Sequence, residues 1–396
     1  MFKFKIQDIK NLDLTRVVPL LIGFYLLFSF ISITVSQTFL FLSMVGCILV
    51  LFQLREKPRF PDFFWPLGVY MVLSFVSSIF SVNPGLSLKE SRGLLLFLVI
   101  PIVFNGFYKK RMAIRINHLL LASAVISCLY SVFIFLFKAV PGERIAGFMG
   151  HYMTQAGLLL LFSVMSLSLL LFSRERTRFL WGIGLALALF SITLTLTRSA
   201  WVGLIAAAVL ILLLYKPKSL FIIPVAVGLF FLITPQHVKN RALSIFSLKN
   251  MTNQYRFEYM RAGLKIIGDY PLLGTGPDTV DLVFQNPKYG LSEIAKKNVH
   301  LHNNFFQIAA ERGVPALVAW IVFIIWTFTS LLRRFKNKDP SCKAFTVAGL
   351  AALAALMTAG LFEYNFGDSE VVILFLYMIT FPFVLSDSRN RKTAEE

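Results

Sequence analysis

The feature of this sequence that most constrains its fold is a succession of apolar runs, each about as long as the hydrocarbon core of a bilayer. A helix needs about 20 apolar residues to cross that core. Only 15% of the 396 residues are charged, whereas an ordinary soluble domain carries about 25%. We therefore expect an all-α, polytopic membrane protein in which residues 1–396 form a single membrane domain.

Twelve apolar runs are candidate transmembrane spans, and the fourth, ninth and twelfth of them are short. They are 17–36, 38–54, 63–82, 93–107, 118–137, 155–173, 179–197, 199–215, 219–234, 314–332, 344–362 and 371–385. With a cytoplasmic N-terminus, the inside segments hold 24 Lys and Arg residues and the short outside loops hold 5. This bias agrees with the positive-inside rule, so we expect both termini in the cytoplasm.

The net charge of +19 is explained by these loops rather than by nucleic-acid binding. The Lys and Arg residues lie between apolar runs, and no basic helix or aromatic-basic module is present. Cys47, Cys128 and Cys342 are isolated and predict neither a disulfide framework nor a metal knuckle. The N-terminus lacks the pattern of a cleaved signal peptide.

One long segment, residues 235–313, lies outside the membrane between the ninth and tenth spans. Asn253 is a candidate cap for a helix that runs to about Ile267 and ends before Pro271. Apolar residues recur along it with helical spacing, at Phe257, Met260, Leu264 and Ile267. A second short helix is expected from near His302 to Gly313. The segment therefore predicts a helical cap over the membrane surface.

The spans contain no Asp, Glu, Lys or Arg by this assignment. An ionisable residue inside the membrane is the usual sign of an ion or proton pathway. Its absence argues against a charge-coupled transporter and directs attention to the polar groups outside the spans.

Two arginines are candidate phosphate ligands. Arg198 lies between two spans with almost no loop, and it is either a topology residue or a guanidinium at the rim of a membrane cavity that binds phosphate bidentately. Arg256 opens the amphipathic helix, where it is either part of a solvated face or a ligand. Arg261 is the expected surface partner of Glu258 on that helix.

His302 is the candidate general base. In the first turn of a helix, the positive end of the dipole would lower its pKa and leave it neutral and able to accept a proton. The alternative is a capping or interface histidine. His300 and His302 could suggest a metal pair, but no third ligand lies nearby in the sequence, so we expect no metal site.

Three acidic residues, Glu363, Asp368 and Glu370, follow the eleventh span. They form no compact metal-ligand motif. They are either a solvated loop or groups that orient an acceptor or pair with the outside arginines.

Several of these residues resemble the motifs of bacterial O-antigen ligases. The run Asn298-Val299-His300-Leu301-His302-Asn303, followed by Gly313-Val314, resembles the family's histidine signature. Thr197-Arg198-Ser199 resembles its first arginine motif. Arg256-Phe257-Glu258, with Pro271-Leu272-Leu273-Gly274-Thr275-Gly276 downstream, resembles the second. Met260 departs from the pattern, because many relatives have Trp there.

The resemblance implies a membrane glycosyltransferase of the GT-C type in the O-antigen ligase and polymerase superfamily. Such an enzyme lies in the bacterial inner membrane with its active site facing the periplasm. It transfers a glycan from undecaprenyl diphosphate to the lipid A-core oligosaccharide, with inversion and without a metal or cofactor. Arg198 and Arg256 would bind the diphosphate and His302 would act as base. Supporting roles are expected for His300, Asn303, Arg261, Arg312, Glu363 and Asp368.

Related functions remain open at this stage. O-antigen polymerases use the same type of donor, and protein-glycosylating relatives usually carry a larger C-terminal soluble region than residues 386–396. A non-enzymatic transporter of lipid-linked glycan would show polar residues or broken helices at mid-membrane, and the sequence shows little of either.

Overall fold

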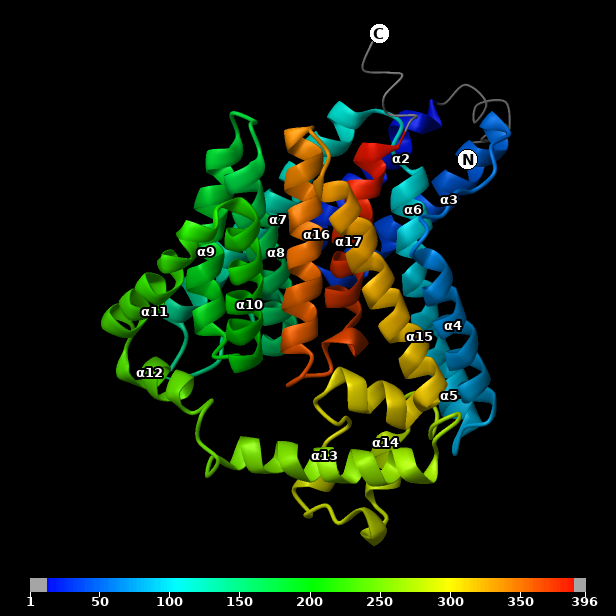
Figure 1. The fold of residues 1–396 in the computed structure, drawn as a ribbon, viewed down its shortest axis with the longest axis vertical. Coiled ribbons are helices and arrows are strands. Elements are labelled where there is room, and N and C mark those ends of the chain that lie inside the picture. The colour runs from blue at the N-terminus through cyan, green and yellow to red at the C-terminus, as the bar shows by residue number, and fades with distance from the viewer. Residues whose placement is uncertain (1–12, 141, 388–396) are drawn as a thin grey trace, which may run out of the picture.

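The computed structural model describes residues 13–140 and 142–387, and within these residues all regular structure is helical (Figure 1). The helices are α2 (Leu14–Phe28), α3 (Ile33–Leu54), α4 (Phe64–Ile79), α5 (Pro84–Glu90), α6 (Val99–Asn105), α7 (Lys110–Phe137), α8 (Tyr152–Phe172), α9 (Arg178–Leu194), α10 (Arg198–Tyr215), α11 (Ile222–Ile233), α12 (Gln236–Leu243), α13 (Met251–Asp269), α14 (Val280–Phe284), α15 (Asn304–Phe335), α16 (Pro340–Ala359) and α17 (Ser369–Ser386).

Seven of these helices are long and apolar enough to cross a membrane: α3, α7, α8, α10, α15, α16 and α17. Four further apolar helical segments are shorter, namely Leu14–Phe28, Phe64–Ile79, Arg178–Leu194 and Pro217–Ile233. The fold is therefore that of a polytopic membrane protein, while the total of twelve spans stays a prediction.

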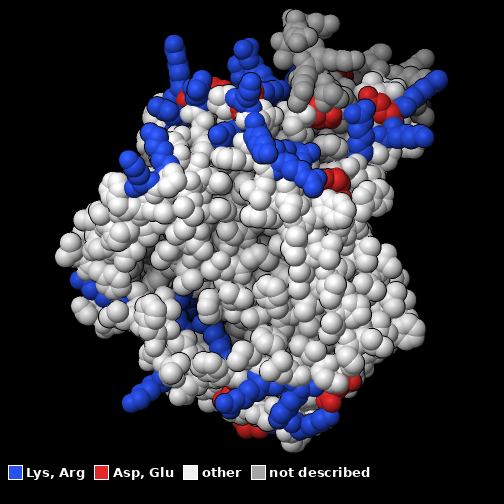
Figure 2. Space-filling view, in the orientation of Figure 1, with Lys and Arg blue, Asp and Glu red and all other residues white. Residues whose placement is uncertain are grey.

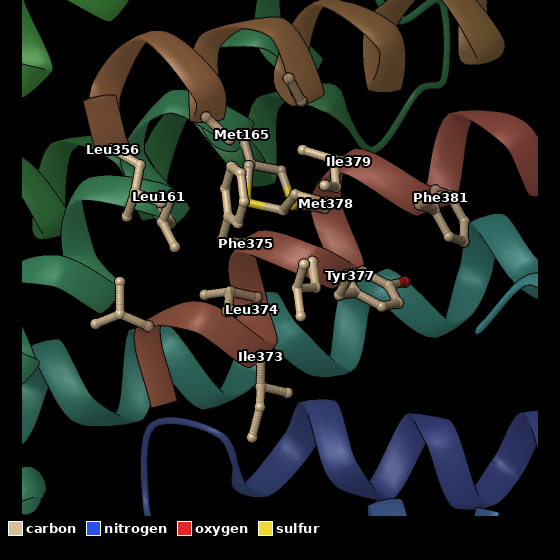
Figure 3. Packing of buried hydrophobic residues seen from close by; sticks show 14 of the residues in the cluster. Leu161, Met165, Leu356, Ile373, Leu374, Phe375, Tyr377, Met378, Ile379 and Phe381 are labelled. Atoms are coloured by element: carbon tan, nitrogen blue, oxygen red, sulfur yellow. The ribbon is translucent and has the colours of Figure 1, made fainter. Parts of the chain in front are cut away.

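Helix α17 lies at the centre of the bundle. Every residue from Val371 to Leu385 is buried, as expected for a helix that is apolar on all sides and surrounded by others. Figure 3 shows Phe375 and Met378 of α17 packing beside Leu161 and Met165 of α8. The adjoining helices α8 and α16 are also mostly buried, so these three form a rigid core beside which the polar segments are held.

Charged residues gather mainly at two ends of the molecule, and the band between them is largely uncharged apart from some Lys and Arg side chains at its lower left (Figure 2). The start of α2 and the end of α17 lie at the same end (Figure 1), and in this view that end is the richer in Lys and Arg. The band fits a bilayer core. Residues 1–12 and 388–396, for which a cytoplasmic position is predicted, lie outside the described residues.

Two predicted span boundaries differ from the structure. The first run was expected to continue to residue 36, but α2 ends at Phe28 and α3 begins at Ile33 because the Ser32 side chain caps its N-terminus. The fourth run, 93–107, is split into a 3-10 segment, Ser91–Leu98, and the short helix α6. Hydropathy alone does not register such breaks, because the residues on both sides remain apolar.

Helix α13 lies across the opposite end of the bundle from the termini (Figure 1). The prediction that Asn253 caps it was wrong, since Asn250 accepts the capping hydrogen bond from Thr252 and the helix continues past Gly268 to Asp269. Asn253 lies inside the helix instead. Its side-chain oxygen accepts a hydrogen bond from Arg198 at 3.0 Å.

Most of the predicted apolar face of α13 does not face a protein core, although Ile267 packs against a buried cluster. Phe257, Met260 and Leu264 are exposed. The buried side consists of Tyr259, Ala262, Gly263 and Ile266, and its small residues allow close approach to the segment before α15. The helical period was correct, but it did not indicate which face packs against protein.

Two glycines join the turn after α13 to helix α15. Gly313 has φ of 81° and kinks α15. A Cβ added there would overlap the Leu272 carbonyl, and a Cβ on Gly274, where φ is 68°, would overlap the Glu311 backbone. The two backbones are held together by hydrogen bonds from Thr275 N to Ala310 O and from Gly276 N to Glu311 O, both 2.8 Å.

We expect Gly313→Ala to destabilise the folded protein because alanine disfavours a positive φ by about 1–2 kcal/mol and also overlaps Leu272. The expected result is a melting temperature several degrees below that of the wild type in detergent, measured by tryptophan fluorescence. Gly228→Ala is the matched control, because a Cβ there meets nothing within 4 Å. Equal melting temperatures for the two variants would contradict the close-packing argument.

Candidate active site

A cavity of about 230 Å³ lies between α10, α13 and the two chain segments that precede α15 and follow α16. Arg198, Arg256 and His302 all line this cavity, although they are far apart in the sequence. Its walls are otherwise largely apolar, with Val202, Phe257, Met260 and Phe362 among the lining residues. The cavity therefore combines apolar surface with a small number of cationic and basic groups.

Arg198 is the first residue of α10 and is buried, with 4% of its surface exposed. Its guanidinium donates to the carbonyl and hydroxyl oxygens of Ser244, at 2.9 and 3.0 Å, and to Asn253 Oδ1 at 3.0 Å. These three contacts come from the end of α12 and from α13. They fix the plane of the guanidinium, as directional recognition of a phosphate group requires.

Arg256 lies on α13 and faces the same cavity. Within the described residues, no hydrogen bond or ion pair satisfies its guanidinium, which lies 5.8 Å from the centre of the Phe362 ring. Burial lowers the pKa of Arg256, and the nearby Arg241 acts in the same direction, while Glu363 opposes both. A partly buried guanidinium of this kind is available to bind an anion.

Two further arginines contribute positive charge near the cavity. Arg241 donates to the Leu196 carbonyl at 3.2 Å. Arg144 donates to the Thr195 carbonyl and to Thr197 Oγ1, both at 3.0 Å, and its guanidinium stacks on the Tyr152 ring at 3.4 Å. Arg144, Arg241 and Arg256 all act electrostatically on Arg198. Four guanidiniums thus create a positive field.

His302 does not lie in the first turn of a helix, so that part of the sequence prediction was wrong. Asn303 caps α15 by accepting from the backbone N–H groups of Phe305 and Phe306, and its amide donates to the Leu361 carbonyl. His302 precedes this cap with φ of 52°. Such a left-handed conformation is strained for a non-glycine residue and is often found at functional sites.

A carboxylate orients the imidazole ring of His302. Its Nδ1 lies 3.0 and 3.1 Å from the two oxygens of Glu363. Burial by itself raises the pKa of Glu363, but hydrogen bonds from His300 and His302 hold that pKa well below its usual range. An ionised carboxylate only accepts hydrogen bonds, so Nδ1 carries the proton. In the neutral ring, Nε2 is then a proton acceptor.

Two loops from different parts of the chain hold this pair together. Asn304 receives a hydrogen bond from the backbone of Phe366 at 3.1 Å, donates its amide to Asn365 at 2.7 Å, and donates its backbone N–H to the Gly360 carbonyl at 2.8 Å. The segment before α15 is therefore fastened to the segment after α16. This contact brings Glu363 to a histidine 61 residues away.

His300 completes a cluster that sequence reasoning missed. Its Nε2 lies 3.2 Å from Glu363 Oε1, and its ring centre lies 4.4 Å from that of His302. Ligand atoms of His300, His302 and Glu363 lie within 4.8 Å of one another, close enough to hold a metal ion. Glu363, in the loop after α16, is thus the third possible metal ligand that the sequence near His300 and His302 lacks.

Residues 183–321 match the family model described as O-Antigen ligase. This segment of the chain is similar to the O-antigen ligase family. A comparison with curated proteins gives no match. The family supports a glycosyltransferase of the O-antigen ligase or polymerase type, which implies lipid-linked glycan substrates and a membrane setting.

Among the described residues that line the cavity, all but Leu361 and Phe362 lie within the matched segment, and Arg198, Arg256 and His302 are among them. Glu363 lies beyond its end, so the carboxylate that orients His302 comes from outside the matched region. Arg144 also lies outside it. Neither contact has a local sequence signal, because each depends on how distant loops pack.

Supporting roles were also predicted for Arg261, Arg312 and Asp368, which lie away from His302 and are not among the described residues that line its cavity. Arg261 is exposed on α13, and its expected partner Glu258 accepts from Ser292 instead. Arg312 pairs with Glu311 at 2.7 Å in a second cavity. Asp368 caps α17 and accepts from Thr154 at 2.6 Å, and burial together with Glu370 raises its pKa to about 7.

Proposed function

We propose that the protein is an O-antigen ligase that transfers a glycan from undecaprenyl diphosphate to the lipid A-core oligosaccharide. The observation that carries the proposal is one cavity lined by two arginines and a carboxylate-oriented histidine. A lipid-linked glycan carries its own activated leaving group, so no nucleotide sugar is needed. The reaction would take place at the periplasmic face of the bacterial inner membrane.

In this mechanism, Arg198 and Arg256 bind the diphosphate. Departure of the diphosphate develops negative charge on the bridging oxygen, and fixed guanidiniums stabilise that charge. Arg144 and Arg241 add to the field without being required to touch the donor. The apolar side chains of Phe257 and Met260 suit contact with the polyprenyl chain.

His302 would act as the general base. Its Nε2 accepts the proton of the attacking acceptor hydroxyl, while the proton on Nδ1 remains shared with Glu363, which stabilises the imidazolium. The oxygen then forms a bond to the anomeric carbon as the bond to the diphosphate breaks. Direct displacement of this kind inverts the anomeric centre.

Complementation of a ligase-null strain tests the proposal. We expect the gene for this protein to restore long-chain lipopolysaccharide on a gel in place of bare core, in a strain whose donor glycan belongs to the same pathway. Restoration only in a polymerase-null strain, where core with a single repeat becomes long-chain material, would assign the polymerase reaction instead. Failure in both strains would reject this proposal.

Chelation tests the role of metal. We expect transfer by the purified protein to be unchanged in excess EDTA because arginines neutralise the diphosphate charge in this mechanism. The measurement is the rate of transfer to rough lipopolysaccharide before and after chelation. A loss of rate that Zn²⁺ restores would assign the His300, His302 and Glu363 cluster to a catalytic metal.

A further inference from the structure

A second cavity, of about 340 Å³, lies next to the histidine cluster but is lined by different residues. The His300 ring packs between His302, which lines the first cavity, and Tyr364, which lines the second, with ring centres 4.4 and 6.1 Å away. The chain around residue 363 also contributes Phe362 to the first cavity and Tyr364 to the second. The two cavities therefore flank the His300–Glu363 contact.

The two cavities differ in charge. Among the described residues, the first is lined by Arg198 and Arg256 and by no acidic residue. The second is lined by three acidic residues, Glu90, Asp278 and Glu311, and by a single cation, Arg312, which is already paired with Glu311. Such a lining disfavours a diphosphate, because repulsion would oppose its binding.

The polar groups of the second cavity have capacity for further hydrogen bonds. Arg312 donates from Nη1 to Glu311 and Tyr364, at 2.7 and 3.3 Å. Its Nε is buried and has no hydrogen-bond partner within the described residues. A buried donor of this kind calls for an explanation, and a ligand that brings an oxygen to Nε supplies one.

Aromatic rings form another part of the wall. Phe97 and Phe366 stack with ring centres 5.9 Å apart, and Tyr70 meets both rings edge-on. Carboxylates accept hydrogen bonds from hydroxyl groups, and aromatic faces provide apolar contact area with a polar edge. Together these groups match an uncharged, hydroxyl-rich ring better than an anion or a lipid chain.

We propose that the second cavity binds an uncharged sugar ring of the acceptor glycan, while the first holds the donor diphosphate. This inference rests on the proposed function, since it assigns a place to its second substrate. The donor and the acceptor would then bind in two cavities of different charge, on either side of the cluster of His300, His302 and Glu363. Asp278 and Glu90 accept hydrogen bonds from the sugar hydroxyls, and Arg312 donates to a sugar oxygen.

Gly93 offers a direct test, because it lines the second cavity and a Cβ added there meets no atom within 4 Å. Gly93→Phe places a bulky side chain at the wall of the second cavity. We expect the KM for rough lipopolysaccharide to rise about tenfold or more, and the KM for the lipid-linked donor to stay within about twofold. Gly68→Phe is the matched control, since Gly68 also faces open space but lines neither cavity.

Asp278→Asn provides an independent test that preserves shape. Asp278 has φ of 58°, a conformation that asparagine also tolerates. We expect a selective rise of about threefold to tenfold in the acceptor KM, because an amide is a weaker hydroxyl acceptor than a carboxylate. Core oligosaccharide freed of lipid A should inhibit the wild type and inhibit both variants less.

The outcomes separate this inference from the proposed function. If the wild-type protein transfers glycan and neither Gly93→Phe nor Asp278→Asn changes the acceptor KM selectively, the second cavity is not an acceptor site. A selective change in either variant supports it. If the wild-type protein transfers no glycan to core, the proposed function fails first.

Discussion

His302→Ala is expected to lower the rate of glycan transfer by about 10²–10⁴-fold, the range that a positioned general base contributes. The reason is that Nδ1 is committed to Glu363 and Nε2 is left as the proton acceptor in the cavity. The measurement is the turnover of purified protein in detergent with saturating donor and acceptor. Binding of the lipid diphosphate should be unchanged, because the arginines remain.

The controls for this prediction separate a base from a structural histidine. His237→Ala changes an exposed histidine on α12 and should leave turnover near that of the wild type. Glu363→Gln should lower turnover less than His302→Ala, because the imidazole remains but the imidazolium loses its anionic partner. Full turnover by a well-folded His302→Ala protein would remove His302 from the mechanism.

Arg256→Ala should reduce transfer about 10²-fold or more, in line with the loss of one group that stabilises developing charge. Its guanidinium has no hydrogen bond or ion pair within the described residues, so the substitution removes a ligand contact without breaking a structural one. Binding of undecaprenyl diphosphate, measured directly, should weaken as well. Melting temperature should change little.

Arg261→Ala is the matched control for this prediction, because Arg261 lies on the same helix and is exposed. It should retain nearly full transfer. Arg198→Ala should be inactive too, but it also leaves Ser244 and Asn253 without their partner, so its stability should fall. Equal activities for Arg256→Ala and Arg261→Ala would mean that the positive charge of Arg256 does not contribute to glycan transfer.

The sequence was sufficient to predict an all-helical membrane protein and to single out Arg198, Arg256 and His302. Apolar runs and motif spacing are local features of the sequence. In the structure the apolar runs form helices, and the three motif residues line one cavity. The contact between His302 and Glu363 could not be read in this way, because it depends on Asn304 fastening two loops together. Similarly, Asn253 could be a cap or a partner for Arg198, and only the packing decides.

The exposed apolar face of α13 shows a second limit of prediction from the spacing of apolar residues. Phe257, Met260 and Leu264 have the helical spacing that the sequence predicts, but they are exposed, and the first two line the cavity. In a soluble protein, an apolar stripe faces the core. Beside a membrane, lipid and lipid-like ligands satisfy the same stripe, while Ala262 and Gly263 mark the close protein contact.

The contact between the two loops also determines when, during synthesis of the chain, the candidate active site can form. His302 is translated before α15, but Glu363 follows only after α16, and α17 must fill the centre of the bundle to hold both. A ribosome-bound chain that ends before residue 363 has the histidine without the carboxylate that orients it. The site is therefore complete only after the segment that contains Glu363 and α17 has been made and packed into the bundle.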